Sequence, residues 1–93
     1  MNRSHVFTLA AALRRKGLSL SEALRKAWAT VKLRVSMAAK PTSFFYLKHD
    51  GTERFAVGSL ELPATTAPGM VVTYYDMLAR DYRSFRADRL LLD

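Results

Sequence analysis

The stretch that decides the fold is SFFYLKHDGTERFAVGSL, residues 43–60. Its two apolar runs, SFFYLK and ERFAVGSL, have the aromatic, period-two character of strands, and the polar HDGT segment joins them. Asp50-Gly51 places a glycine where a tight hairpin turn requires a positive φ. We therefore predict a β-hairpin here, with Gly58 at a bulge or sharp bend of the second strand.

Alternation along the first of these strands separates its side chains onto two faces. Phe44, Tyr46 and Lys48 share one face, whereas Phe45 and Leu47 share the other. A barrel of this size is filled by about eight to ten apolar side chains. The predicted occupants are Leu47, Phe55, Val57, Val72, Phe85, Leu90 and Leu91.

Downstream of the hairpin, the sequence predicts three more strands. The prolines and small polar residues of ELPATTAPG, residues 61–69, indicate a loop. MVVTYYD is then a third strand, MLARD a connection, YRSFR a fourth strand, and ADRLLLD a turn leading to a short last strand. Five short strands predict a small, strongly bent barrel over residues 41–93.

Upstream of the hairpin, residues 1–40 have the period of two amphipathic helices. Ser4 is the predicted N-cap of the first helix and Gly17 its C′ residue. The apolar positions of this helix are Val6, Leu9, Ala10 and Leu13. The chain is thus predicted to be an α+β protein in which this basic helical lead-in and the barrel form one compact domain.

The second helix has the clearest start signal in the chain. Ser19 and Glu22 form a capping box, so the helix begins near Leu20, and Pro41 ends it at Lys40. We predict one apolar stripe facing a core, formed by Leu20, Leu24, Ala27, Trp28, Val31, Val35 and Ala38. The predicted polar side contains Arg25, Lys26, Lys32, Ser36 and Lys40.

FFYLKHDGTERFAVGSL followed by VVTYYDMLARDYRSFRADRLL resembles the small WYL-related, Sm-like SH3-type β-barrel family of bacteria and their phages. The most specific pieces are the TYYD, YRSFR and RLL segments and the residues Tyr46, Lys48, Asp50, Gly51, Arg54 and Gly58. Members usually carry a larger aromatic residue in place of Tyr82 and often threonine in place of Ser59. The resemblance implies a five-stranded barrel. Related WYL domains sense ligands in transcription regulators, and the wider Sm and SH3-like group binds RNA or peptides, which is analogy at the level of the fold.

Positive charge is concentrated in the N-terminal half of the chain. Residues 1–40 contain nine bases and one acid, a net +8, whereas residues 41–93 contain six bases and seven acids, a net −1. This asymmetry indicates contact with a polyanion, although a solvated helix face or favourable charge at a helix C-terminus explains it equally well. The candidate phosphate contacts are Arg14, Arg15, Lys16, Arg25, Lys26, Lys32, Arg34 and Lys40.

Tyrosines and bases of the barrel half form a second candidate surface for a ligand or partner. Its residues are Tyr46, Lys48, Arg54, Tyr74, Tyr75, Arg83 and Arg86. For any single tyrosine we favour the competing interpretation, packing beneath the second helix. Three acids among the C-terminal arginines are predicted to form surface ion pairs: Asp76, Asp81 and Asp88.

Several function classes have no support in the sequence. The chain has no cysteine, and its two histidines lie far apart, so we predict no metal site. Nucleotide-binding and hydrolase motifs are absent, so we expect neither an enzyme nor a cofactor. No apolar run approaches the roughly 20 residues that span a bilayer. The lack of cysteine favours a cytoplasmic setting.

Two function classes remain open. One is a module associated with DNA or RNA through the basic helical face. The other is a protein-interaction or ligand-sensing module, for example a phage or mobile-element accessory protein that binds a host protein. Either would be able to form a homo-oligomer through barrel edge strands. The position of the tyrosines distinguishes between these two function classes, because burial of the tyrosines beneath the second helix would weaken the nucleic-acid hypothesis.

Overall fold

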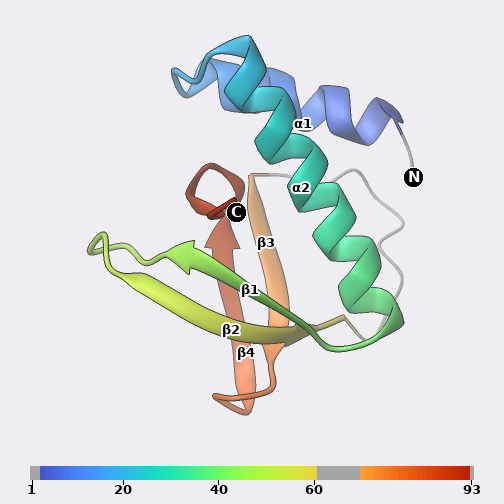
Figure 1. Cartoon of the computed structure of the whole chain (residues 1–93), viewed down its shortest axis with the longest axis vertical. Coiled ribbons are helices and arrows are strands. Elements are labelled where there is room, and N and C mark those ends of the chain that lie inside the picture. The colour runs from blue at the N-terminus through green and yellow to red at the C-terminus, as the bar shows by residue number, and fades with distance from the viewer. Residues whose placement is uncertain (1–2, 61–69, 93) are drawn as a thin grey trace.

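In the computed structural model, which describes residues 3–60 and 70–92, two helices precede one antiparallel sheet (Figure 1). The helices are α1 (Arg3–Arg15) and α2 (Leu20–Ala39). The strands are β1 (Thr42–Leu47), β2 (Glu53–Ser59), β3 (Val71–Asp76) and β4 (Asp81–Arg86), in the order β1-β2-β3-β4. The predicted sequence of two helices and a small antiparallel sheet is confirmed. The predicted loop over 61–69 lies outside the described residues.

The predicted fifth strand is wrong for the described residues. Residues Ala87–Arg89 form a 3₁₀ turn, η1, and Leu90 makes only an isolated antiparallel bridge to Tyr46 of β1. The Leu91 N–H also donates to the Phe45 carbonyl over 3.0 Å. Among the described residues, the segment after η1 therefore pairs with β1 through this bridge and this hydrogen bond and forms no strand of its own.

The hairpin turn between β1 and β2 follows the prediction. Gly51 has a φ of +88°, and its N–H donates to the Lys48 carbonyl over 2.9 Å. The Asp50 carboxylate accepts hydrogen bonds from the backbone N–H and the hydroxyl of Thr52. A three-residue turn that ends in a left-handed glycine matches the twist of the two strands.

The boundaries of α2 and the end of α1 are also set locally. Ser19 Oγ accepts a hydrogen bond from the Glu22 N–H over 3.2 Å, which confirms the predicted start of α2. Gly17, with a φ of +103°, ends α1 through hydrogen bonds of its own N–H and that of Leu18 to preceding carbonyls. The start of α1 differs, because the helix begins at Arg3 and Ser4 therefore does not precede it.

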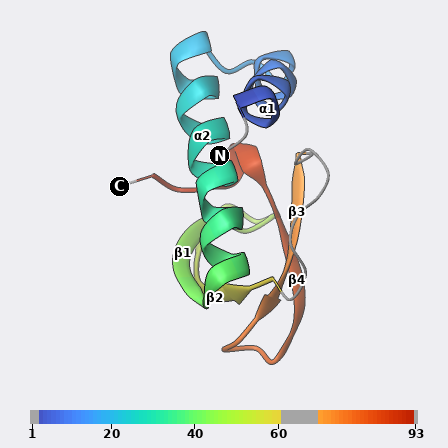
Figure 2. The ribbon, with the colours of Figure 1, turned by 90° about the vertical axis from the view of Figure 1, so that its right-hand side faces the viewer.

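Helix α2 connects two hydrophobic clusters. Figure 2 shows α1 beside the first half of α2 and the sheet beside its second half. The cluster between the helices comprises Val6, Leu9, Ala10, Leu13, Ala23, Ala27, Val31 and Ala87. The cluster between α2 and the sheet comprises Leu33, Met37, Phe44, Tyr46, Ala56, Val72, Tyr74, Phe85 and Leu90. Neither α1 nor α2 is long and apolar enough to cross a membrane.

The buried face of β1 is the opposite of the predicted one. Phe44 is 8% exposed and Tyr46 is buried with it, whereas Phe45 is 45% exposed and forms a cross-strand pair with the exposed Phe55. Three of the seven predicted core residues are buried, namely Val72, Phe85 and Leu90; Leu47, Val57 and Leu91 are half-buried. Because both faces of β1 are apolar, alternation alone could not select the inner one.

Gly58 allows α2 to approach this inner face closely. A Cβ atom at this position would lie 2.6 Å from Met37 Sδ and 2.9 Å from ring carbons of both Phe44 and Tyr74. Gly58 also pairs with β1 and with β3, so it marks the point where β2 changes partner. The bulge or sharp bend predicted at Gly58 stays a prediction, and the structure gives close packing as a physical reason for the glycine.

Candidate nucleic-acid interface

The outer face of α2 combines basic and apolar side chains. Arg25, Trp28, Lys32 and Val35 recur at spacings of three and four residues, which places them on one face of the helix. All four are exposed, and the Trp28 residue is 45% exposed. Glu22 is the only acid of α2, and its carboxylate accepts a hydrogen bond from Ser19 at the start of the helix. No acidic residue therefore follows Arg25 along this face of α2.

The predicted apolar stripe of α2 is correct only in part. Ala27 and Val31 are buried and Leu24 is half-buried, but Leu20, Trp28, Val35 and Ala38 are exposed. The buried face instead includes Ala23, Thr30, Leu33 and Met37. The reason is that α1 and the sheet contact α2 on the side that carries its smaller residues, and the large indole lies at the margin.

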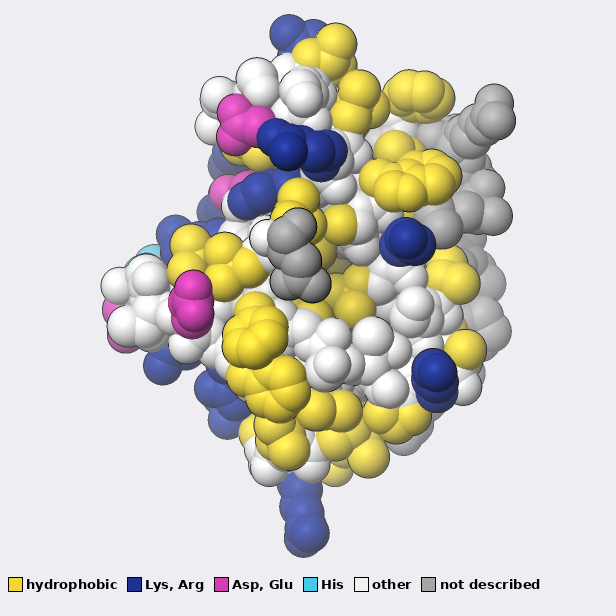
Figure 3. All heavy atoms as spheres, viewed as in Figure 1, with side chains coloured by type: hydrophobic (Ala, Val, Ile, Leu, Met, Phe, Trp, Pro, Cys, Tyr) yellow, Lys and Arg dark blue, Asp and Glu magenta, His cyan; other side chains and the backbone are white. Residues whose placement is uncertain are grey.

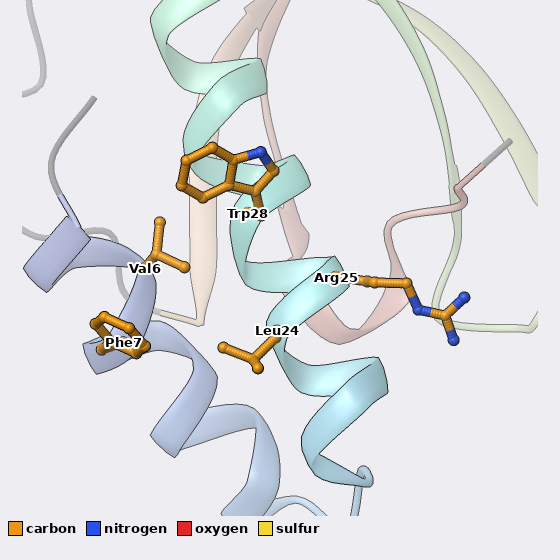
Figure 4. Close-up of a pocket in the computed structure, with 5 residues that line it drawn as sticks. All are labelled: Val6, Phe7, Leu24, Arg25 and Trp28. Carbon is orange, nitrogen blue, oxygen red and sulfur yellow. The ribbon is translucent and has the colours of Figure 1, made fainter.

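A groove of about 490 Å³ lies between α1 and α2 (Figure 4). Val6 and Phe7 line it from α1, and Leu24, Arg25 and Trp28 line it from α2. The Phe7 residue is 62% exposed, although the neighbouring Val6 is buried. Figure 3 shows hydrophobic and basic side chains next to each other over the two helices. Figure 4 shows the Arg25 guanidinium pointing away from the other four side chains. The groove itself therefore fits an apolar or aromatic group, and an anion would bind outside it.

The eight predicted phosphate contacts divide into two groups. Six of them are exposed: Arg14, Arg15, Lys16, Arg25, Lys32 and Lys40. Lys26 instead donates from Nζ to the Asp88 carbonyl over 2.6 Å and so joins α2 to η1. Arg34 is half-buried, and burial lowers the pKa of its guanidinium from the usual value. Lys26 and Arg34 are therefore less available to a nucleic acid.

Two of the predicted surface tyrosines lie in the core beneath α2. The hydroxyl oxygens of Tyr46 and Tyr74 are 3.0 Å apart, and the Tyr74 hydroxyl donates to Asp76 Oδ2 over 3.5 Å. Burial raises the pKa of Tyr74, and its hydrogen bond with Tyr46 raises it further. Neither ring is available to stack on a ligand base. Packing beneath α2, the favoured interpretation for a single tyrosine, is thus observed for Tyr46 and Tyr74. This outcome weakens the nucleic-acid hypothesis and leaves the basic helical face as its support.

Asp76 is a buried structural residue, so its predicted surface ion pair is wrong. Its carboxylate accepts hydrogen bonds from the N–H groups of Leu78 and Ala79 and lies 3.3 Å from Arg54 Nη2. Burial raises the pKa of Asp76, but the hydrogen bonds from Ala79, Leu78 and Arg54 outweigh it and hold the pKa below the usual value. Arg54, predicted to contact a ligand, is therefore the partner of this buried carboxylate.

The remaining residues of the predicted ligand surface do not converge on one site. Tyr75 is half-buried and packs edge-on against the exposed Tyr82, with ring centroids 5.3 Å apart. Arg86 forms a two-bond ion pair with Asp88, as predicted for that aspartate, and Arg83 is exposed on β4. Of the seven residues, Tyr46, Lys48 and Arg86 line one depression of about 170 Å³.

The described residues contain no group of three His, Cys, Asp or Glu side chains arranged to hold a metal ion. Trp28 and Phe7 are the surface residues that sequence reasoning missed. The signal for Trp28 was its spacing, because a residue three positions after one exposed base and four before another shares their face. Phe7 has no comparable signal, since it adjoins the buried Val6.

Comparison with protein families gives one match. Residues 30–91 match the family model WYL_2, described as a Sm-like SH3 beta-barrel fold. The chain belongs to the WYL_2 family. Searches of curated proteins and of solved structures find no match. The WYL_2 match begins after Trp28, so all five residues that line the groove precede it.

Proposed function

We propose that this WYL_2 protein is a non-enzymatic module that binds nucleic acid through the outer face of α2 and the basic end of α1. The observation that carries the proposal is the Arg25, Trp28 and Lys32 series, in which two exposed bases flank an exposed aromatic residue on one helix face. Sequence-independent binding of nucleic acid has two components. Lysine and arginine side chains contact the phosphates, and aromatic side chains stack on the nucleobases.

Electrostatics adds support, because Glu22, which lines one depression with Arg25, is the one acid of α2 beside these bases. Residues 1–40 have a net charge of +8. The ion pairs among the described residues, Arg54 with Asp76 and Arg86 with Asp88, involve none of the six exposed bases among the predicted phosphate contacts. Phosphates would release counterions from this surface, so binding should weaken linearly on a logarithmic scale as salt increases.

Anisotropy titrations of labelled DNA and RNA oligonucleotides at several salt concentrations test the proposal. Lys32→Glu should lower affinity for all sequences and reduce the salt slope by about one. Arg80→Glu is the matched control, because it makes the same charge change at an exposed residue of the turn between β3 and β4 and belongs to neither candidate surface. No binding at about 50 mM salt, or equal effects of the two substitutions, would refute the proposal.

A second candidate function is docking of a partner protein, for example a host protein bound by a phage or mobile-element accessory factor, or binding of a small apolar ligand. The observation that favours it is the apolar lining of the groove by Val6, Phe7, Leu24 and Trp28. Under this alternative, Phe7→Ala would abolish partner capture, and Lys32→Glu would leave it unchanged.

Self-association through strand edges stays a prediction. Among the described strands, β1 and β4 are the edges of the sheet, and the bridge to Leu90 covers part of β1. An edge strand whose backbone groups are unpaired is a template for pairing with another strand. Light scattering of the purified chain measures whether such pairing occurs in solution.

A further inference from the structure

Trp28 lies at the margin of the helix packing, where much of its indole stays in solvent. Its neighbours Ala27 and Thr30 are fully buried, yet the largest apolar side chain of α2 leaves 45% of the residue in solvent. Leu24 lies one turn earlier and is half-buried in the groove, and Phe7 on the facing helix is 62% exposed. Contiguous apolar surface of this kind typically marks a binding site.

The surroundings of the indole decide which group it can bind. Arg25 and Lys32 lie about one helical turn before and after Trp28, at roughly 4.5 and 6 Å along the axis given a rise of 1.5 Å per residue. Beside the indole, Val6 and Leu24 form an apolar wall of the groove (Figure 4). A ligand that fits has a flat apolar ring and an anionic group on each side of it.

We infer that the groove between α1 and α2 binds an unpaired nucleobase against the Trp28 indole, and that this site selects single-stranded over double-stranded nucleic acid. The inference rests on the proposed nucleic-acid function and specifies its substrate class. A base within a duplex is already stacked on both faces, whereas a base in a single strand presents a free face. Lys32 and, once its side chain turns from the direction seen in Figure 4, Arg25 then contact the phosphates on either side of that base.

The charge of this face favours a nucleotide over the apolar anchor of a protein. A protein helix that filled the groove would need its own acidic residues beside each anchor to balance Arg25 and Lys32. Every nucleotide carries both the ring and the phosphate. Because every nucleobase has a flat face that can stack on the indole, binding at this site should not depend on the nucleotide sequence. Single-stranded DNA and single-stranded RNA share this chemistry, so both are tested.

Trp28 itself provides the assay, since it is the one tryptophan of the chain. Oligothymidylate and oligouridylate of equal length, and a duplex of the same length, are titrated while tryptophan fluorescence and anisotropy are recorded. We expect saturable quenching by one or both single strands and little quenching by the duplex. Affinity for single strands should exceed that for the duplex about 5- to 150-fold, the range of one stacked base.

Substitutions separate stacking from phosphate contact. Trp28→Ala should weaken single-strand binding by the same 5- to 150-fold and leave the salt slope unchanged, and Trp28→Phe should restore part of the affinity. Lys32→Glu should change the salt slope while quenching persists at saturation. Circular dichroism and thermal unfolding check that the Trp28 variants are folded, which the exposure of this residue predicts.

The outcomes that overturn the inference differ from those that overturn the proposed function. Salt-dependent binding without quenching, with Trp28→Ala as active as the parent, overturns the stacked base and leaves the nucleic-acid function standing. Equal affinity for single strands and duplex has the same meaning. Failure of every oligonucleotide to bind at low salt refutes the proposed function itself, and the groove is then a protein site if Trp28→Ala abolishes capture of a partner.

Discussion

The aromatic residues beneath α2 include polar tyrosines, whereas several apolar aromatic residues lie on the outer surface. Phe44, Tyr46, Tyr74 and Phe85 form a buried group whose ring centroids lie 5.1–6.3 Å apart. The wholly apolar rings of Phe7, Phe45 and Phe55 are exposed, as is Trp28. The hydroxyl groups of Tyr46 and Tyr74 are thus buried, while the four apolar aromatic residues are exposed. Burial is possible for the tyrosines because Asp76 and Arg54 complete their hydrogen-bond network.

The largest effect should come from comparing adjacent phenylalanines on opposite faces of β1. Phe44→Ala removes a ring from the buried group and should lower the free energy of unfolding by about 3–5 kcal/mol. Phe45→Ala removes an exposed ring and should cost about 1 kcal/mol or less. Urea unfolding of the two variants measures the difference. Equal losses would mean that the inner face of β1 is assigned wrongly.

Removing the carboxylate that supports the buried tyrosines should have the next largest effect. Asp76→Asn leaves Arg54 without its ionic partner and should lower the free energy of unfolding by about 2–3 kcal/mol. Asp81→Asn, at an exposed residue, is the matched control and should change stability by less than about 0.5 kcal/mol.

The same carboxylate should make the fold sensitive to acid. Because the pKa of Asp76 is lower in the folded chain than in the unfolded chain, its stabilisation is complete above the unfolded value of about 3.9. That stabilisation is lost as the pH falls through the folded pKa. Thermal unfolding between about pH 7 and pH 3 should show this loss in the parent and a flatter profile in Asp76→Asn. Parallel profiles would contradict the assignment.

Adding one methyl group at Gly58, next to the buried rings of Phe44 and Tyr74, should have a smaller effect. Gly58→Ala places a Cβ atom within 3 Å of Met37 and of two rings, and should cost about 1–3 kcal/mol through displacement of these side chains. The neighbouring Ser59→Ala adds no atom and serves as the control. If thermal unfolding shows no difference between the two variants, the approach of α2 to β2 is looser than described.

The smallest effect should come from removing one tyrosine hydroxyl, either from the buried Tyr46 or from the exposed Tyr82. Tyr46→Phe deletes one partner of the buried hydroxyl pair and should cost about 1 kcal/mol. Tyr82→Phe makes the same chemical change at a residue that is 61% exposed and should leave stability within about 0.5 kcal/mol of the parent. Denaturant unfolding of both variants measures this contrast. A larger loss in Tyr82→Phe would reverse the comparison.

The sequence predicted the basic residues of the candidate site but not its aromatic residue, Trp28. Six of eight predicted phosphate contacts are exposed, because long basic side chains on an amphipathic helix seldom have another place to lie. For Tyr46 and Tyr74 the favoured interpretation, packing beneath α2, is observed, but no local pattern indicates that the buried Asp76 accepts a hydrogen bond from Tyr74. Trp28 was assigned to the core on hydrophobicity, although its spacing from Arg25 and Lys32 places it on their face.

The sequence by itself determined the features that depend on neighbours along the chain. The capping residue Ser19, the left-handed glycines at 17 and 51 and the concentration of positive charge before residue 41 follow from local hydrogen bonding, backbone sterics and composition. Only the tertiary structure decided which face of β1 and which margin of α2 would be buried. A strand or helix that is apolar on more than one side offers several surfaces, and the contacts of α1, α2 and the sheet select among them.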